Sequence, residues 1–499
     1  MAFKKGKEPD ESRISPMKKE VVENYDRLPS QLKHCFAFCR LFPKDYEIGV
    51  EEVINLWIAQ GFIKSSSENQ NDLEDVGYAH FMHLVWGSFF EPPFKSDDDD
   101  VVKFKIHDAM HDLAILMAGT TGVVIDGPKA KVFDDRTRHV SLTFSSIELW
   151  KIPMDSLKQN RKLRTFLSSN QKHDDFIQRL YSMGFSKLPN TIGGLKHLRY
   201  LNLSSNPFVS LPNSITTLHS LHTLNLEYCE KLWRLPQEID KLLNLKHLLL
   251  KGCLSLVFMP SGLGRLTSLR RLGEFNQCSY RSKNIARLEE LGNLNSLRGS
   301  LRINLKHGKH DSLECSAAHL NKKQHLQHII LSWEVEGDDD ITGEMIESDE
   351  LSLDALQPHQ NLKILTIHQC TGIRLAHWLS LLTNLVYLSL DACIKCQQLP
   401  ELDQLPSLQE LHLSELGSLE YISPKFSASS LFFPSLTSLS IFHCPKLKGW
   451  WRDSANLNQA QGHFVLPSFS CLSVLNIYDC LFAMEEGAIL SAAPTIIRT

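Results

Sequence analysis

Two histidines at helical spacing are the first residues in this sequence that could do chemistry. His107 and His111 lie four positions apart, with Asp108 beside the first, a distant likeness to the His-Glu-x-x-His pattern of zinc hydrolases. Zinc hydrolysis would also need a third ligand and a carboxylate long enough to act as the general base. Aspartate is shorter than glutamate, and no third ligand is evident. We therefore predict no metal site and keep a zinc hydrolase as an alternative.

Phosphate chemistry would require a glycine-rich loop followed by lysine and a hydroxyl residue. In a Gly-x4-Gly-Lys-Ser/Thr loop, the backbone N–H groups and the lysine bind phosphate, and the hydroxyl binds magnesium. Around Gly308 and Lys309 the sequence has Ile303 in place of the first glycine and His310 in place of Ser or Thr. We expect this chain neither to hydrolyse ATP nor to act as an enzyme of any other class.

The cysteines belong to a repeat pattern. Cys393 and Cys396 have CxxC spacing, but no second pair follows at a zinc-like distance. Six of the 12 cysteines instead stand three residues after the last strand leucine or isoleucine, where a leucine-rich repeat accepts Asn or Cys: Cys229, Cys253, Cys370, Cys393, Cys444 and Cys480. We expect buried turn residues there, neither disulfides nor metal ligands.

The repeat itself is a leucine pattern that recurs every 23 or 24 residues. Successive copies begin at Leu198, Leu221, Leu245 and Leu269, and regularity resumes at Leu362. One copy cannot bury enough apolar surface to offset its ordering entropy, so repeats of this length are stable only as an array. The pattern predicts a solenoid with a parallel β-sheet on its concave face.

The segment before the repeats has the pattern of a small helical domain. Apolar residues at three- and four-residue spacing predict helices over 21–28, 31–41, 50–59, 72–85 and 108–118. Residues 88–94 and 101–106 favour a hairpin, and this order is typical of a winged helix. Four aspartates at the expected hairpin tip, Asp97 to Asp100, would repel phosphates, so we expect a protein-contact module and no nucleic-acid binding.

The fold class that follows is α/β, a small winged-helix domain followed by a leucine-rich-repeat solenoid. We place a disordered tail at 1–20, the winged-helix domain at 21–118 and a connector at 119–138. A first array of repeats spans 139–272, irregular repeats with a polar insertion span 273–350, and a second array spans 351–499.

Side chains between the strand leucines should point to the concave face, because strand residues alternate between faces. Aromatic, histidine and charged side chains on a rigid face are suited to recognising a protein partner. The candidate residues are Tyr200, Asn202, Glu227, His247, Lys251, His368, Tyr387, Asp391, Glu410, His412, Phe442 and Tyr478.

The net charge and hydropathy narrow the function classes further. A formal charge of −4 and a pI near 6.6 give no electrostatic footprint for nucleic acid. No run of 18 apolar residues predicts a membrane span, and the start of the sequence lacks a signal-peptide core. We expect a cytoplasmic protein.

Three segments of the helical domain carry a family resemblance. Residues 28–46, 56–63 and 106–114, the last reading Ile-His-Asp-Ala-Met-His-Asp-Leu-Ala, resemble the winged-helix part of plant nucleotide-binding leucine-rich-repeat immune receptors of the coiled-coil class. The resemblance implies a switch that holds ADP or ATP, with His111 reaching the β-phosphate, Met110 packing and Asp112 fixing the local geometry. It also implies that the P-loop core is missing from this sequence, so no cofactor is expected in the chain itself.

The function that we expect from this resemblance is recognition of a protein partner, either a pathogen-derived effector or a guarded host protein. The winged helix would pack against the repeats or against a nucleotide-binding core supplied in trans. An alternative is a leucine-rich-repeat adaptor or decoy regulator, such as a ubiquitin-ligase substrate receptor, which would carry its own recruitment motif.

Overall fold

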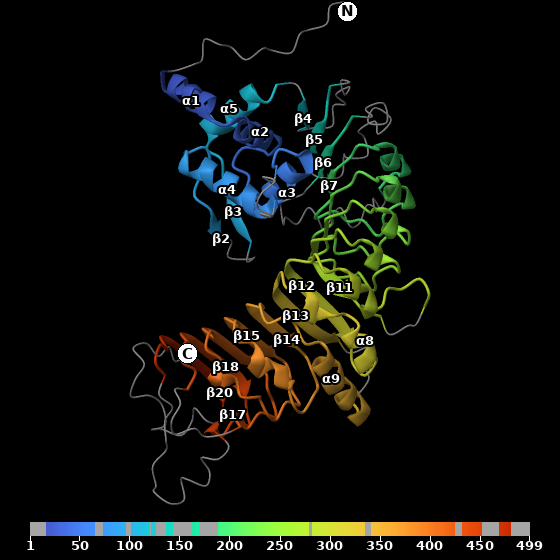
Figure 1. Ribbon diagram of the computed structural model, residues 1–499, viewed down its shortest axis with the longest axis vertical. Coiled ribbons are helices and arrows are strands. Elements are labelled where there is room, and N and C mark those ends of the chain that lie inside the picture. Colours follow the sequence, from blue (N-terminus) through green and yellow to red (C-terminus); the bar gives the residue numbers. More distant parts are fainter. Residues whose placement is uncertain are drawn as a thin grey trace, which may run out of the picture. The chain divides into compact units, whose positions relative to one another are not determined.

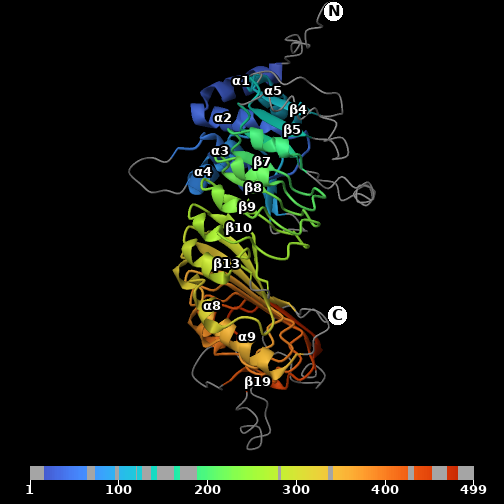
Figure 2. The ribbon, with the colours of Figure 1, turned by 90° about the vertical axis from the view of Figure 1, so that its right-hand side faces the viewer.

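The chain forms two compact units, Met1–Lys231 and Leu232–Thr499, in the computed structural model (Figures 1 and 2). The structure describes residues 16–64, 73–95, 101–119, 121–125, 136–142, 162–168, 188–278, 282–334, 341–424, 432–451 and 469–480. The expected acidic hairpin tip at 97–100 and the aspartates at 338–340 lie outside these ranges.

Five helices and a small antiparallel sheet make up the first part of the first unit. The helices are α1 (Pro16–Arg27), α2 (Ser30–Phe38), α3 (Val50–Gln60), α4 (Leu73–Trp86) and α5 (Asp108–Met117). The strands β1 (Ile48–Gly49), β3 (Val102–Phe104) and β2 (Phe94–Lys95) pair in that order. This is the predicted succession of helices, hairpin and helix, with boundaries shifted by a few residues.

Two local expectations in this part were wrong. Helix α1 begins at Pro16, inside the expected tail, since proline is tolerated in the first turn of a helix, where its missing N–H is not needed. The strand expected over 88–94 is reduced to Phe94–Lys95. Ser88 turns the chain at φ 59°, and Pro92 and Pro93 have no N–H to donate to a neighbouring strand.

An aromatic cluster holds these helices and strands together. Phe104 of β3 packs 4.9 Å from Phe81 and 4.7 Å from Phe90 between ring centroids, and Phe36 packs 5.0 Å from Phe89. All five side chains are buried, together with Trp57 of α3. Aromatic pairs at these separations add stability beyond the area that they bury, so α3 is fixed within a rigid support.

Parallel strands of the solenoid complete the first unit. They are β4 (Gly122–Ile125), β5 (His139–Leu142), β6 (Thr165–Ser168), β7 (Tyr200–Asn202) and β8 (Thr223–Asn225), each paired with the next. The solenoid therefore starts one strand before the expected residue 139. A strand of only four residues has too little periodicity to be recognised without the sheet beside it.

The second unit carries most of the repeats. Strands β9 (His247–Leu249) and β10 (Arg271–Leu272) pair with each other. An eight-stranded parallel sheet follows, with β11 (Glu274–Asn276), β12 (Gly299–Lys306), β13 (Leu326–Glu334), β14 (Ile364–His368), β15 (Tyr387–Asp391), β16 (Glu410–Ser414), β18 (Ser438–Cys444) and β20 (Val474–Cys480) in that order. The short strands β17 (Tyr421–Ser423) and β19 (Gly449–Trp451) form a separate pair.

The region 273–350, expected to be irregular, contributes three strands in register. Strands β11, β12 and β13 lead directly into β14, so the sequence period breaks while the sheet continues. The extra residues form helices α8 (Ser312–Ser316) and α9 (Gly343–Ala355) between strands. A solenoid tolerates such insertions because they leave the strand-to-strand contacts unchanged.

The six repeat cysteines are buried free thiols. The Sγ atom of Cys229 donates to the Leu203 carbonyl oxygen at 3.1 Å, and Cys393 and Cys480 reach the equivalent carbonyls of their preceding strands at 3.9 Å. Asn206 makes the same kind of bond, to the Ser168 carbonyl of the preceding strand at 3.0 Å, and it also donates to the Leu203 carbonyl of its own repeat at 3.0 Å. These residues bond the turn backbone, as the repeat pattern predicted.

Candidate functional site

Helix α5 presents the histidine of the 110–112 segment to the interior. His111 is 6% exposed, and its Nε2 lies 2.7 Å from the carbonyl oxygen of Phe42. A carbonyl can only accept, so Nε2 carries a proton and donates. The other ring nitrogen, Nδ1, is buried and has no hydrogen-bond partner among the described residues. His111 therefore anchors α5 through one nitrogen and leaves the other unused.

The two neighbours of His111 also fix α5 in place. Met110 packs against the buried cluster of the helical domain. Asp112 forms an ion pair with Lys44 at 2.8 Å, with both side chains about half-exposed. An exposed pair of this kind contributes at most about 1 kcal/mol. Both the ion pair and the His111 bond join α5 to the segment that follows α2.

The structure does not unite His107 and His111 into a metal site. His107 is the residue that caps α5, where its Nδ1 accepts the Ala109 N–H at 3.3 Å, while His111 is held by Phe42. No group of three or more His, Cys, Asp or Glu side chains that could hold a metal occurs in the described ranges. The arrangement lacks the ligand set that zinc hydrolysis requires.

Helix α3 lies against strands β6 and β7 of the first unit, as Figure 1 shows. In the last turn of α3, the Gln60 Nε2 donates to Thr165 Oγ1 at 2.8 Å, and the Arg199 guanidinium donates to the Ala59 carbonyl at 3.2 Å. In the first turn, Asn202 Nδ2 donates to Glu52 Oε1 at 2.9 Å. Polar contacts therefore bind both ends of α3 to the repeats.

Apolar contacts accompany these hydrogen bonds. Tyr200 of β7 and Leu167 of β6 belong to the same buried cluster as Trp57 of α3. The ring of His139 on β5 packs 4.9 Å from Phe38 in a T-shaped arrangement. The helical domain and the first repeats therefore share one hydrophobic core.

This contact overturns part of the expected concave surface. Tyr200 and Asn202 point to the face that we predicted, but they are fully buried there by the helical domain. They are already occupied within the chain and not open to a separate partner in this arrangement. The alternation of side chains along a strand predicts the face of the sheet on which each residue lies. It does not predict which other part of the chain covers that face.

A carboxyl pair lies within the same contact. Glu52 is partly buried in α3, and Glu227, another predicted concave residue, follows β8. Burial is the largest cause that raises the pKa of Glu52, to about 7; the nearby Glu227 carboxylate adds to it, and the hydrogen bond from Asn202 opposes it. Glu52 therefore titrates near neutral pH.

The remaining predicted concave residues belong to the second unit. His247 on β9 is buried, while Lys251 is exposed. The register of the eight-stranded sheet aligns His368, Asp391, Phe442 and Tyr478 in one row across β14 to β20, and pairs Tyr387 with Glu410 in a parallel row.

These rows form a mixed polar and aromatic surface. His368 Nδ1 lies 3.0 Å from Asp391 Oδ2, and the His412 ring centroid lies 5.3 Å from that of Phe442. Tyr478 at the end of the row is 50% exposed. The structure thus brings together seven of the predicted residues on one face of the second unit, with aromatic side chains able to contact a partner.

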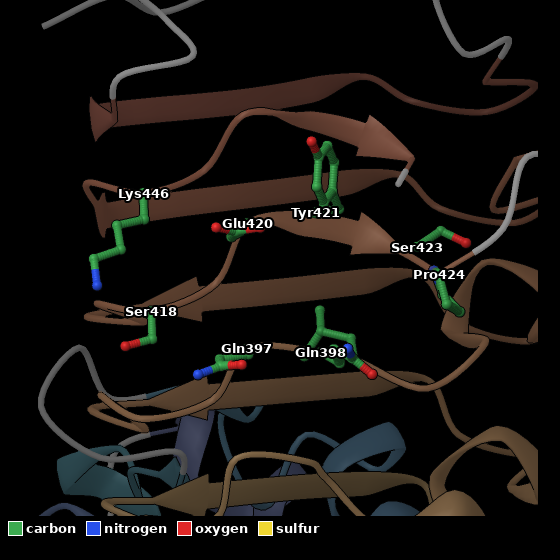
Figure 3. A pocket seen from close by; sticks show the side chains of 9 residues that line it. Gln397, Gln398, Ser418, Glu420, Tyr421, Ser423, Pro424 and Lys446 are labelled. Atoms are coloured by element: carbon green, nitrogen blue, oxygen red, sulfur yellow. The ribbon is translucent and has the colours of Figure 1, made fainter. Parts of the chain in front are cut away.

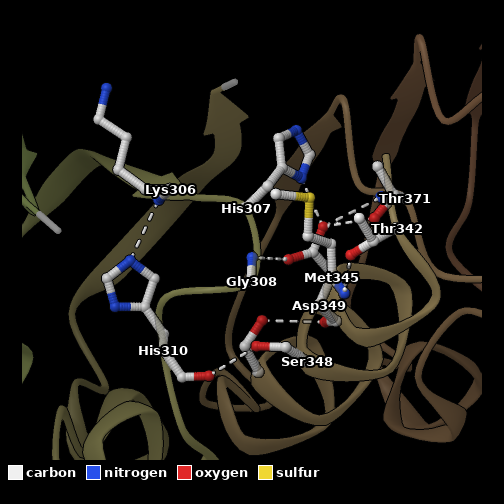
Figure 4. Close-up of polar contacts among 10 residues, drawn as sticks. Lys306, His307, Gly308, His310, Thr342, Met345, Ser348, Asp349 and Thr371 are labelled. Carbon is white, nitrogen blue, oxygen red and sulfur yellow. Dashed lines mark hydrogen bonds and ion pairs between the residues drawn. The ribbon is translucent and has the colours of Figure 1, made fainter. Parts of the chain in front are cut away.

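A buried polar network that sequence reasoning missed fixes helix α9 (Figure 4). Asp349 is fully buried, and its carboxylate accepts from Thr371 Oγ1 at 2.6 Å and from the Gly308 N–H at 3.2 Å. His307 Nδ1 lies 2.6 Å from the same carboxylate. Because Asp349, the His307–Gly308 pair and Thr371 come from three separate segments, no local spacing in the sequence could indicate this network.

A small cavity lies along β17 in the second unit (Figure 3). Its volume is about 180 Å³, below the 300–1,000 Å³ that is usual for small-molecule sites. The lining is mainly polar: Gln397, Gln398, Leu399, Ser418, Glu420, Tyr421, Ser423, Pro424 and Lys446. We assign it no ligand.

Comparison with known proteins identifies both parts of the chain. Residues 186–455 match the leucine-rich repeat region model, and residues 41–114 match the disease resistance protein winged helix domain. The chain belongs to the leucine-rich-repeat disease resistance proteins. It is 36% identical over 488 residues to the disease resistance protein RGA2 of Solanum bulbocastanum, which covers 95% of this chain and 46% of that protein.

A second curated relative is the disease resistance protein RGA1 of the same species. It is 34% identical over 445 residues, covering 88% of this chain and 42% of the relative. The chain thus spans about half the length of the curated relatives that it matches. Among solved structures, a leucine-rich repeat protein of Leptospira interrogans is 20% identical at a TM-score of 0.37, over 73% of this chain and 81% of that one.

The sequence analysis did not predict the residues that hold α3 against the repeats. Glu52, Gln60 and Arg199 carried no distinguishing spacing, because each is an ordinary polar residue until the fold brings it to a contact. None of the helices in the described part of the chain is both long and apolar enough to cross a bilayer.

Proposed function

We propose that the chain is the winged-helix and repeat portion of a plant immune receptor, and that it acts by recognition without catalysis in the cytoplasm. The exposed rows on β14 to β20 bind a protein partner, either pathogen-derived or from the host. The winged helix is restrained by the first repeats. The observation that carries this proposal is the attachment of α3 to β6 and β7 at both of its ends.

The two concave regions therefore have different roles. Tyr200 and Asn202 are covered from within the chain, while Glu410 and Tyr478 remain exposed. A face with half-exposed aromatic and charged residues on a rigid sheet has the composition of a protein interface. Restraint of the winged helix and recognition of a partner can then occupy separate repeats.

His111 is the residue through which a nucleotide-binding core, supplied by another segment or chain, would act on this portion. Its buried Nδ1 without a partner could donate to a phosphate oxygen if the ring took up a proton. Within this chain that nitrogen faces no P-loop, so ADP has too few contacts to bind tightly.

Thermal unfolding tests the nucleotide part of the proposal. Micromolar ADP should leave the midpoint of the isolated chain unchanged, since a ligand stabilises only as far as it binds the folded state. Stabilisation by ADP that disappears in His111→Ala would overturn this view and place a nucleotide site in the chain itself.

Partner recognition is tested by proximity labelling of the whole chain in plant tissue. A variant with Tyr387→Ala, His412→Ala and Phe442→Ala should lose specific labelled proteins that the wild type retains. The matched control is Leu254→Ala with Leu381→Ala, since these side chains are 81% and 56% exposed elsewhere in the second unit.

The pattern of labelled proteins separates the outcomes of that experiment. Identical sets for wild type and the triple variant would contradict recognition by this face. Labelled ubiquitin-ligase subunits that depend on residues 16–118 would favour an adaptor instead.

A further inference from the structure

The contact between α3 and the repeats contains two partly buried carboxyl groups, Glu52 and Glu227, and an asparagine amide lies beside each of them. Asn202 Oδ1 accepts the Ser204 N–H at 2.9 Å, so its amino group is directed to Glu52. Asn225 Oδ1 likewise accepts the Glu227 N–H at 2.9 Å, and its Nδ2 lies 3.3 Å from Glu227 Oε2. Each asparagine therefore directs its amide N–H groups to the carboxylate, while its amide oxygen is bonded to the backbone.

Among the described residues of the repeats, the groups that face Glu52 are acidic or neutral, while Lys103 of β3, paired with Gly49 just before α3, forms an ion pair with Glu47 at 3.7 Å. Glu227 comes from the turn after β8, and Tyr200 and Asn202 come from β7. Arg199 binds the opposite end of α3, at Ala59, about 10 Å along the helix from Glu52.

The amino-terminal turn of α3, which contains Glu52, favours a carboxylate anion. Burial and the Glu227 carboxylate disfavour that anion. Their effect is the larger one, so the pKa of Glu52 is raised to about 7.

Tyr200 adds a further polar group to this contact. Its side chain is completely buried near both carboxyl groups, and its hydroxyl has no hydrogen-bond partner among the described residues. A buried hydroxyl without a partner destabilises the arrangement that buries it. The contact is therefore well packed but electrostatically costly.

We propose that docking of α3 onto the first repeats takes up a proton at the Glu52 and Glu227 pair, so that the winged helix is held more tightly at low pH and is released as the pH rises. This inference rests on the restraint of the winged helix proposed above. It adds that proton binding controls how tightly α3 is held on the first repeats.

The direction follows from linkage between proton binding and docking. Because the docked state raises the pKa of Glu52 above the 4.5 of an unperturbed glutamate, the docked state binds the proton more strongly. Docking is then fully supported below pH 4.5 and loses this support progressively as the pH rises through 7. The equilibrium constant for opening should rise by about 10- to 30-fold between pH 5.5 and pH 8.

Hydrogen exchange of the full chain, corrected for the intrinsic pH dependence of amide exchange, measures this opening. Peptides spanning 50–60 and 199–203 report the two sides of the contact. In the wild type their protection should fall from pH 5.5 to pH 8. Glu52→Gln keeps the acceptor oxygen and mimics the protonated acid, so it should remain protected at both values.

The matched control is Glu51→Gln, an exposed carboxyl in the same turn of α3, which should follow the wild type. If Glu52→Gln fails to fold, Glu227→Gln serves instead and should reduce the pH dependence by removing the second carboxylate. Equal pH dependence in wild type and the neutralised variant would overturn the proton inference. Absence of protection in both peptides at every pH would overturn the docking itself.

Discussion

At the scale of single residues, side chains of the same type have different structural roles, depending on their burial and their hydrogen-bond partners. Two asparagines illustrate this: Asn202 is buried between β7 and α3, where it bonds Glu52, and Asn213 is exposed at the start of a turn. The energetic weight of an amide depends on whether water can replace its partner.

Replacing Asn202 tests that difference. Asn202→Ala leaves the partly buried Glu52 carboxyl group without its hydrogen-bond donor, so it should destabilise the first unit by about 1–3 kcal/mol. Asn213→Ala should change stability by less than about 0.5 kcal/mol. Chemical denaturation of both variants measures the effect, and equal stability would mean that the contact is open in solution.

Asp349 should have a still larger effect, in the second unit. Asp349→Ala removes one acceptor from His307, Thr371 and Gly308, which should cost about 3 kcal/mol because several buried donors lose their partner together. Glu347→Ala, at an exposed position of the same helix, is the control. Thermal unfolding and the exchange rate of residues 343–355 provide the readout, and similar values for both variants would show that the network does not hold α9.

At the scale of elements, two glycines of the solenoid lie directly against the backbone of the next turn. A Cβ on Gly193 would lie 2.5 Å from the Ser214 carbonyl oxygen, and one on Gly292 would lie 2.5 Å from the Ala317 carbonyl oxygen. Both glycines stand two residues before the leucine that ends a 3-10 turn. At Gly193 and Gly292 the next turn therefore stacks too closely for a side chain, whereas the equivalent position of the following turn accommodates Thr216.

Adjacent glycines in the first of these turns provide a matched test. Gly193→Ala forces backbone apart and should cost about 1–3 kcal/mol. Gly194→Ala meets no atom within 4 Å and should be neutral or slightly stabilising, since alanine restricts the unfolded chain. Denaturation midpoints that are equal for the two variants would contradict the tight stacking of repeats.

The elements also show what the sequence could predict. Leucine spacing predicted β7, β8 and β14 to β16, and helical periodicity predicted α2 to α5 within a few residues, because these patterns are local. Strands β4 and β11 were missed, since they lie outside the 23- or 24-residue leucine spacing that revealed the equally short β7 and β8. The face of Tyr200 and Asn202 was predicted correctly, but its covering by α3 depends on a domain more than 100 positions away in sequence.

At the scale of the whole molecule, we propose that the first repeats hold the winged helix through α3, while the rows on β14 to β20 remain available to a partner. Residues on both sides of this contact come from distant parts of the chain, as Gln60 and Thr165 do. A coupling free energy between Gln60 and Thr165 therefore measures docking of α3 on β6, and the stability of either segment by itself does not produce it.

A double-mutant cycle on Gln60 and Thr165 tests whether α3 is docked on β6 in solution. Gln60→Ala, Thr165→Ala and the double variant are compared with the wild type by chemical denaturation of the full chain, at a pH fixed below 7. We predict a coupling energy of about 1 kcal/mol, because each single variant breaks the same buried hydrogen bond. Strictly additive effects, within about 0.3 kcal/mol, would show that α3 and β6 do not touch in solution and would contradict the account.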